Sequence, residues 1–162
     1  MTDHRHLNGK RILVVDDEPD ILDTVEDLLS MCTVIKAGSF EEARAALQTQ
    51  SFDLAVLDIM GVDGYELLAL ARNRGVPSVM LTAKALSMTD VKKSYVDGAS
   101  FYIPKEELPH IDVFLEGILE DIETGKNPWG RWMKKMGEFC ERTFGKKWQQ
   151  NDPDFWNNLP FY

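Results

Sequence analysis

The 162-residue sequence has only two cysteines, Cys32 and Cys140, which form neither a metal-ligand pattern nor a disulfide framework. It has no apolar run near the roughly 18 residues of a membrane-spanning helix, and its first residues are too polar for a signal peptide. These absences predict a cytoplasmic protein with reduced thiols and no membrane segment. Basic residues are also scarce, and the net charge of −9 argues against nucleic-acid binding by the whole molecule.

Charge and aromatic residues are distributed unevenly along the chain. Residues 1–125 hold 23 acidic and 11 basic side chains, whereas residues 126–162 hold 4 acidic and 7 basic ones. All four tryptophans lie in the second stretch, which begins at the turn-forming residues Gly125 to Pro128. We therefore predict a domain over residues 1–125 and an aromatic-rich helical extension over residues 126–162.

Short apolar segments alternate with helical patterns along residues 1–125. Five segments have the length and β-branched composition of buried parallel strands: 11–15, 33–37, 53–57, 78–81 and 100–103. Amphipathic helical spacing follows each of them, with helices expected from residue 19, from residue 40, and over 65–74, 89–96 and 111–123. This alternation predicts an α/β fold, a flavodoxin-like doubly wound parallel sheet of five strands with helices on both faces.

Charged and hydroxyl residues follow four of the expected strands. Asp16, Asp17 and Glu18 come after the first strand and Asp58 after the third. In doubly wound sheets the ligand crevice lies outside the carboxyl ends of the strands, so these carboxylates are expected to converge. Converging carboxylates repel one another unless a hard cation with oxygen ligands binds between them, and Mg²⁺ fits this requirement. Glu18 is assigned to the pocket rim or to the helix cap rather than to the metal.

The fourth and fifth strands contribute the groups that a phosphoryl ligand needs. Thr82 follows the fourth strand, and Lys105 lies just beyond the fifth. A hydroxyl and an ammonium group facing the same point can bind the remaining oxygens of a phosphoryl group. Since an aspartate can itself be the nucleophile, the strand ends predict metal-assisted phosphoryl transfer to a carboxylate.

The same residues resemble the receiver domain of bacterial two-component response regulators. The matching segments are ILVVDDEPDI (12–21), DLAVLDIM with its later DGYELL (53–68), MLTAK (80–84) and GASFYIPK (98–105). The resemblance implies that Asp58 accepts a phosphoryl group from the phosphohistidine of a histidine kinase or phosphotransfer protein. It also implies that Asp16, Asp17, Asp58 and the backbone carbonyl of Met60 bind Mg²⁺.

The resemblance further implies a switch. Lys105 would pair with the phosphoryl group, Thr82 would shift to hydrogen-bond it, and Tyr102 would turn inward into the space that Thr82 leaves. A phosphoryl group adds about −1.5 to −2 charge, which is enough to bias such a two-state element. The outcome would be presented to a downstream protein or to a second copy of the chain on the face of the fourth helix, fifth strand and fifth helix.

Two features depart from the receiver pattern. The loop from Asp58 to Gly64 is about two residues shorter than usual and lacks a proline, although its length is allowed for a strand-to-helix connection. This loop carries the Met60 carbonyl and therefore bears on the metal geometry. The family's Lys-Pro order is also inverted to Pro104-Lys105, which bears on the reach of the lysine because proline fixes φ.

The extension has one apolar face. From Trp129 onward its apolar residues follow helical spacing: Trp129, Trp132, Met133, Met136, Phe139, Cys140 and Phe144. So short a helix is not stable alone and must bury this stripe. We favour packing on the chain's own domain or on a twin subunit, ahead of a separate protein partner. DNA binding ranks last because no helix-turn-helix pair is present.

Other functions fit the residues less well. A receiver that has lost phosphorylation and acts as an assembly scaffold through its C-terminal helix is the main alternative. A phosphatase of the haloacid dehalogenase type needs a second aspartate two residues after the nucleophile, where this chain has Met60. A flavin-binding relative of flavodoxin is disfavoured because no phosphate-binding loop rich in Ser, Thr or Gly follows the first strand.

Overall fold

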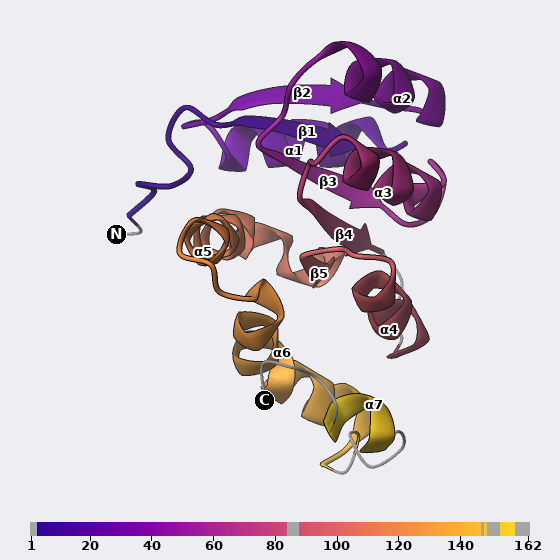
Figure 1. Cartoon of the computed structure of the whole chain (residues 1–162), viewed down its shortest axis with the longest axis vertical. Helices are drawn as coiled ribbons and strands as arrows, with labels where there is room; N and C mark the ends of the chain where they lie inside the picture. The colour runs from indigo at the N-terminus through magenta and orange to yellow at the C-terminus, as the bar shows by residue number, and fades with distance from the viewer. Residues whose placement is uncertain (1–2, 84–87, 147, 149–152, 158–162) are drawn as a thin grey trace.

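The computed structural model describes residues 3–83, 88–146, 148 and 153–157 (Figure 1). Lys84 of the MLTAK segment and the last five residues of the C-terminal tail lie outside this set. Five parallel strands form one sheet in the order β2-β1-β3-β4-β5. Their bounds are Arg11–Val15 (β1), Thr33–Ala37 (β2), Leu54–Asp58 (β3), Ser78–Thr82 (β4) and Phe101–Pro104 (β5). The expected flavodoxin-like fold is therefore confirmed.

Helices connect the strands and cover both faces of the sheet. Their bounds are Pro19–Leu28 (α1), Phe40–Thr49 (α2), Gly64–Asn73 (α3), Met88–Val96 (α4), Ile111–Glu123 (α5), Pro128–Phe144 (α6) and Pro153–Asn157 (α7), with a 3₁₀ helix at Lys105–His110 (η1). The α1 and α5 helices lie on one face, and α2, α3 and α4 lie on the other (Figure 1). No helix in the described part of the chain is long and apolar enough to cross a membrane.

Five strand boundaries differ by one residue from those expected: β3 and β5 each begin one residue later, and β3, β4 and β5 each end one residue later. Asp58, Thr82 and Pro104 are the last residues of β3, β4 and β5, not residues that follow them. These three residues keep the extended backbone because each is paired with a residue of the neighbouring strand. Asp58 pairs with Leu81, and Thr82 pairs with Pro104. Proline is tolerated there because β5 is an edge strand.

The C-terminal helices pack against the domain of the same chain. In Figure 1, α6 lies beside the edge strand β5, between α4 and α5. Its apolar stripe is buried as the spacing predicted, at Trp129, Trp132, Met136 and Cys140. The side chain of Phe139, which belongs to the predicted stripe, lies outside the described residues.

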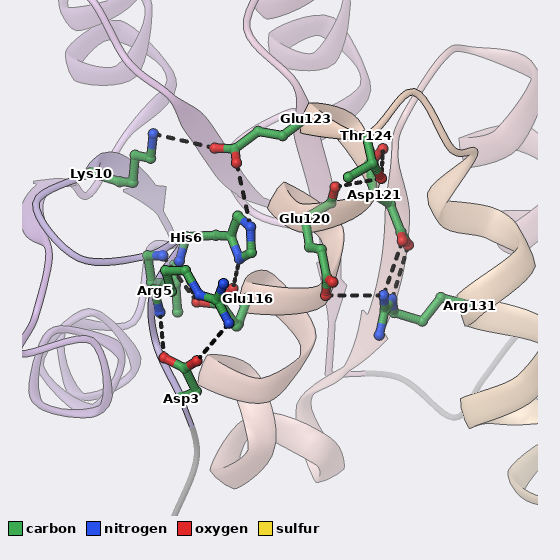
Figure 2. A network of polar contacts seen from close by, with 11 residues as sticks. Asp3, Arg5, His6, Lys10, Glu116, Glu120, Asp121, Glu123, Thr124 and Arg131 are labelled. Atoms are coloured by element: carbon green, nitrogen blue, oxygen red, sulfur yellow. Dashed lines mark hydrogen bonds and ion pairs between the residues drawn. The ribbon is translucent and has the colours of Figure 1, made fainter.

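An N-terminal arm holds α5 on the other side (Figure 2). The Glu116 carboxylate, almost fully buried on α5, accepts backbone hydrogen bonds from His6 at 2.7 Å and from Leu7 at 3.1 Å. It also contacts the His6 ring, while His4 Nε2 lies 2.9 Å from Asp112 Oδ2. These contacts attach the arm to α5 before the chain enters β1.

We expect Glu116→Ala to lower the free energy of unfolding by about 1–3 kcal/mol, because two backbone donors lose their charged acceptor. The measurement is urea unfolding followed by circular dichroism. Glu120→Ala is the matched control on the same helix: its carboxylate is half-exposed and pairs with Arg131 at 3.6 Å, so its loss costs less than about 1 kcal/mol. Equal losses in the two variants would contradict the structural importance of the arm.

Candidate functional site

The strand order brings the predicted site residues to one edge of the sheet. The β1 and β3 strands are neighbours, so Asp16 and Asp17 after β1 lie next to Asp58 at the end of β3. The β4 strand follows β3, and β5 follows β4, which adds Thr82 and then Lys105. The convergence predicted from the strand ends is present in the structure.

Three consecutive carboxylates form an acidic cluster at the end of β1. One oxygen from each of Asp16, Asp17 and Glu18 lies within 4.8 Å of the others. Asp16 is fully buried and its Oδ1 accepts the backbone N–H of Glu18 at 2.9 Å, whereas Asp17 and Glu18 are exposed. Carboxylate oxygens are the hard ligands that a small divalent cation prefers, so the chemistry of this cluster fits Mg²⁺.

Lys105 reaches this cluster despite the inverted Pro104-Lys105 order. Its Nζ lies 2.8 Å from Asp16 Oδ2, 3.4 Å from Glu18 Oε1 and 3.6 Å from Asp58 Oδ1. Pro104 ends β5 in the extended conformation with φ −66°, and the described residues contain no cis peptide bond, so the strand delivers the lysine directly into the pocket. Burial lowers the pKa of Lys105, but the hydrogen bond to Asp16 and the charges of Asp58, Asp16 and Glu18 outweigh it, and the net pKa is raised.

Asp58 is a buried carboxylate with a perturbed pKa. Only 3% of the residue is exposed, and burial together with the negative charge of Asp16 raises its pKa to about 6. The charge of Lys105 and a hydrogen bond from the backbone of Met60 act in the opposite direction, while Asp17 adds to the rise. A carboxylate held among like charges is a strong candidate for metal binding and for group transfer.

Two glycines allow the short loop after β3 to pack against the site. Gly61 has φ +86°, and a Cβ at this position would lie 2.5 Å from Asp17 Oδ2. A Cβ at Gly64 would overlap the backbone of Asp58. The loop was expected to be short, but no role was predicted for these glycines. Their spacing directly after the third strand was the available signal.

Both predicted switch residues are buried. Thr82 is 1% exposed and Tyr102 is fully buried on β5. The backbone carbonyl of Tyr102 accepts a hydrogen bond from the indole Nε1 of Trp132 at 2.8 Å. Tyr102 is thus inside the protein with α6 attached to its strand. Met60, in contrast, has an exposed side chain, and its backbone donates a hydrogen bond to the Asp58 carboxylate.

Comparison with known families decides the identity of the fold. Residues 12–111, more than half of the chain, match the family model described as the response regulator receiver domain. The chain belongs to the response regulator receiver domain family. The match includes Asp16, Asp17, Asp58, Thr82 and Lys105, and the resemblance seen in the sequence is confirmed.

Individual relatives agree with this assignment. The heme response regulator HssR of Staphylococcus haemolyticus is 36% identical over 100 residues, which cover 59% of this chain and 44% of HssR. A CheY-like receiver domain protein of Methanospirillum hungatei is 30% identical with a TM-score of 0.65, covering 73% of this chain and 99% of that one. A response regulator of Burkholderia pseudomallei, solved with a phosphorylated aspartic acid and a calcium ion, is 25% identical with a TM-score of 0.55, covering 60% of each chain.

The chain contains the receiver domain of a two-component response regulator. It spans less than half the length of the curated relatives it matches, whereas it covers nearly all of the solved chain from Methanospirillum. The receiver match ends at residue 111, at the start of α5, so α6 and α7 lie beyond it.

Proposed function

We propose that Asp58 accepts a phosphoryl group from the phosphohistidine of a histidine kinase or of a phosphotransfer protein. The observation that carries this proposal is the position of Lys105, whose ammonium group lies between the Asp58 and Asp16 carboxylates. This arrangement provides a nucleophile, a cation for the transferred charge and an acidic cluster for a metal ion at one edge of the sheet. The phosphorylated aspartate in the Burkholderia relative supports the same assignment.

The reaction transfers the group between two side chains of different proteins. An Asp58 oxygen attacks phosphorus, the P–N bond of the phosphohistidine breaks, and its electron pair returns to the imidazole nitrogen. Lys105 stabilises the negative charge on the phosphoryl oxygens, and the Thr82 hydroxyl donates a hydrogen bond to one of them. This chemistry belongs to a signalling phosphoacceptor that catalyses its own phosphorylation.

Mg²⁺ is the cofactor in this proposal. Asp16, Asp17, Asp58 and the backbone carbonyl of Met60 would hold it, because they offer the oxygen ligands that the ion prefers. When bound, the ion neutralises the pocket and polarises the phosphoryl oxygens. Gly61 supports this assignment, since it lets the loop that carries Met60 lie against the Asp17 carboxylate.

The experiment that tests the proposal is incubation of the full chain with acetyl phosphate, with and without Mg²⁺. We expect intact mass spectrometry to detect the addition of one phosphoryl group only when the metal is present. Peptide mapping after borohydride reduction should place the modification on Asp58. An unlabelled wild-type protein in the presence of Mg²⁺ would support the phosphorylation-independent scaffold instead.

The raised pKa of Asp58 predicts a pH-dependent affinity for Mg²⁺. A proton and the metal ion compete for the carboxylate, so the affinity is constant above about pH 7 and falls as the pH drops through the pKa of about 6. At about pH 5 we expect roughly tenfold weaker binding than at about pH 7.5, measured by calorimetry in matched ionic strength. Equal affinity at both values would contradict competition at Asp58.

The output of the proposed switch is a change in protein contacts. Phosphorylation of Asp58 would reposition Thr82 and Lys105, and Tyr102 on β5 would pass the change to a downstream protein or to a second copy of the chain. Residues 1–125 would act as the receiver and residues 126–162 as its extension. Burial raises the pKa of the thiols of Cys32 and Cys140, to about 11 and about 12, so both stay protonated at neutral pH.

We also propose a cytoplasmic location, because both cysteines are free and a reducing compartment keeps thiols in that form.

A further inference from the structure

Two tryptophans of α6 hydrogen-bond to the chain around β5. Trp129 Nε1 donates to the carbonyl of Ala99 at 2.8 Å, and Trp132 Nε1 donates to the carbonyl of Tyr102 at 2.8 Å. Both indoles are buried, and Trp129 also packs edge-to-face on Tyr95 of α4. The helix therefore supplies donors for two carbonyls along the edge of the sheet in addition to apolar contact.

A partly buried ion pair fixes α6 to α5. Arg131 Nε and Nη2 each lie 2.9 Å from an oxygen of Asp121, whose carboxylate is almost fully buried (Figure 2). Gly117 makes room for this arginine, because a Cβ there would lie 2.7 Å from Arg131 Cδ. Two-point contact of this kind specifies the orientation of α6, so the two tryptophans meet β5 in one register.

The β5 strand connects α6 to the phosphoryl pocket. The backbone carbonyl of Tyr102 accepts the hydrogen bond from the Trp132 indole, and Tyr102 lies three residues before Lys105. Pro104, between Tyr102 and Lys105, has a fixed backbone φ. In the same arrangement Lys105 pairs with Asp16 Oδ2 at 2.8 Å. A cation held by Asp16 would compete with this ion pair, and Lys105 would then pair with the phosphoryl group on Asp58 instead of with Asp16.

We propose that α6 is an intramolecular inhibitor of the pocket, and that it acts through the Trp132–Tyr102 hydrogen bond. This inference rests on the proposed function of Asp58. Docked α6 stabilises the arrangement of β5 in which Lys105 pairs with Asp16, and repositioning of Lys105 weakens the Trp132 contact. Coupling free energies are reciprocal: if loading of the pocket weakens the Trp132–Tyr102 contact, that contact also makes the pocket harder to load.

The test compares two tryptophan variants of the full chain. Trp132→Phe keeps an aromatic ring and loses the hydrogen bond to Tyr102, whereas Trp129→Phe loses a bond of the same length to Ala99, farther from Lys105 in the chain. We measure the affinity for beryllofluoride, a phosphoryl mimic, at saturating Mg²⁺ by calorimetry. In the wild type, loading of the pocket breaks this hydrogen bond, and the loss weakens binding. Trp132→Phe has no such bond to lose, so it should bind beryllofluoride about 3- to 10-fold more tightly. Trp129→Phe should differ from wild type by less than about twofold, because its bond persists in both states.

A second readout uses the wild-type protein, and the tryptophan variants serve only to assign the two indole N–H signals. In the ¹⁵N-labelled wild-type protein, solvent exchange of the Trp132 indole N–H should accelerate about fivefold or more on addition of Mg²⁺ and beryllofluoride, whereas the Trp129 indole should stay protected. Beryllofluoride binding with unchanged Trp132 exchange, or equal affinities of wild type and Trp132→Phe, would overturn the coupling alone. Equal tightening by both variants would overturn the route through Tyr102. A wild-type chain that binds no beryllofluoride would overturn the proposed function and this inference with it.

Discussion

Asp58→Asn is expected to abolish phosphoryl labelling by acetyl phosphate in the presence of Mg²⁺. The amide is neutral and lacks the anionic, nucleophilic oxygen of the carboxylate, and its one remaining oxygen is a weaker ligand for the metal. We expect the labelling rate to fall to below about one-hundredth of the wild-type rate, a loss typical of a missing nucleophile. The measurement is the intact mass over time at fixed acetyl phosphate and Mg²⁺ concentrations.

The matched control for this experiment is Asp63→Asn. Asp63 lies five residues further along the chain in an exposed loop and adopts the left-handed conformation with φ 54°, which asparagine also tolerates. The same change of chemistry at this position should leave the labelling rate within about twofold of the wild type. Labelling that persists in Asp58→Asn and maps to another carboxylate would show that Asp58 is not the acceptor.

The sheet could be predicted from the sequence because its strands are buried on both sides. Continuous apolar runs such as Leu54–Leu57 have only one stable position in an α/β protein, between two layers of helices. The strand order follows once helices alternate with strands and crossovers are right-handed. The exact strand ends could not be read in this way, because pairing with a neighbouring strand extended β3 and β4 by a polar residue each.

The site was predictable for the same reason, since adjacent strand ends must meet. The sequence could not show where the ammonium group of Lys105 would lie, because this depends on the backbone after Pro104 and on the charge balance of the pocket. The structure places it nearer to Asp16 than to Asp58, at 2.8 Å and 3.6 Å. Lys105 has three carboxylates within reach, and it contacts the fully buried one, Asp16, most closely.

Contacts across long sequence separations were the least predictable features. The helical stripe of residues 129–144 indicated burial, but the surface that it covers depends on one partly buried ion pair and two indole hydrogen bonds. The histidines of the N-terminal arm carried no periodic signal, yet His6 binds Glu116, 110 residues away. Such pairings depend on the geometry of the folded chain, which a local pattern does not contain.

Trp132→Ala is expected to cost about 3–5 kcal/mol of the free energy of unfolding, the range for a large aromatic side chain removed from a core. Trp132 is fully buried, packs against Trp129 and donates its indole hydrogen to the carbonyl of Tyr102. The alanine variant leaves a cavity between α6 and β5 and an edge carbonyl without its donor. A loss of this size is a large part of the roughly 5–15 kcal/mol that stabilises a typical domain. Urea unfolding followed by far-UV circular dichroism measures it.

The control is Lys134→Ala, an exposed position on the same helix, where the free energy of unfolding should change by less than about 0.5 kcal/mol. If α6 belongs to the cooperative core, wild type and Trp132→Ala each unfold in one transition, and the variant's transition moves to lower urea. If α6 instead folds and docks as a separate unit, Trp132→Ala leaves the main transition in place and only removes a small earlier one. That second pattern would contradict the prediction that α6 unfolds together with the core around β5. It would show instead that α6 is an element that opens locally.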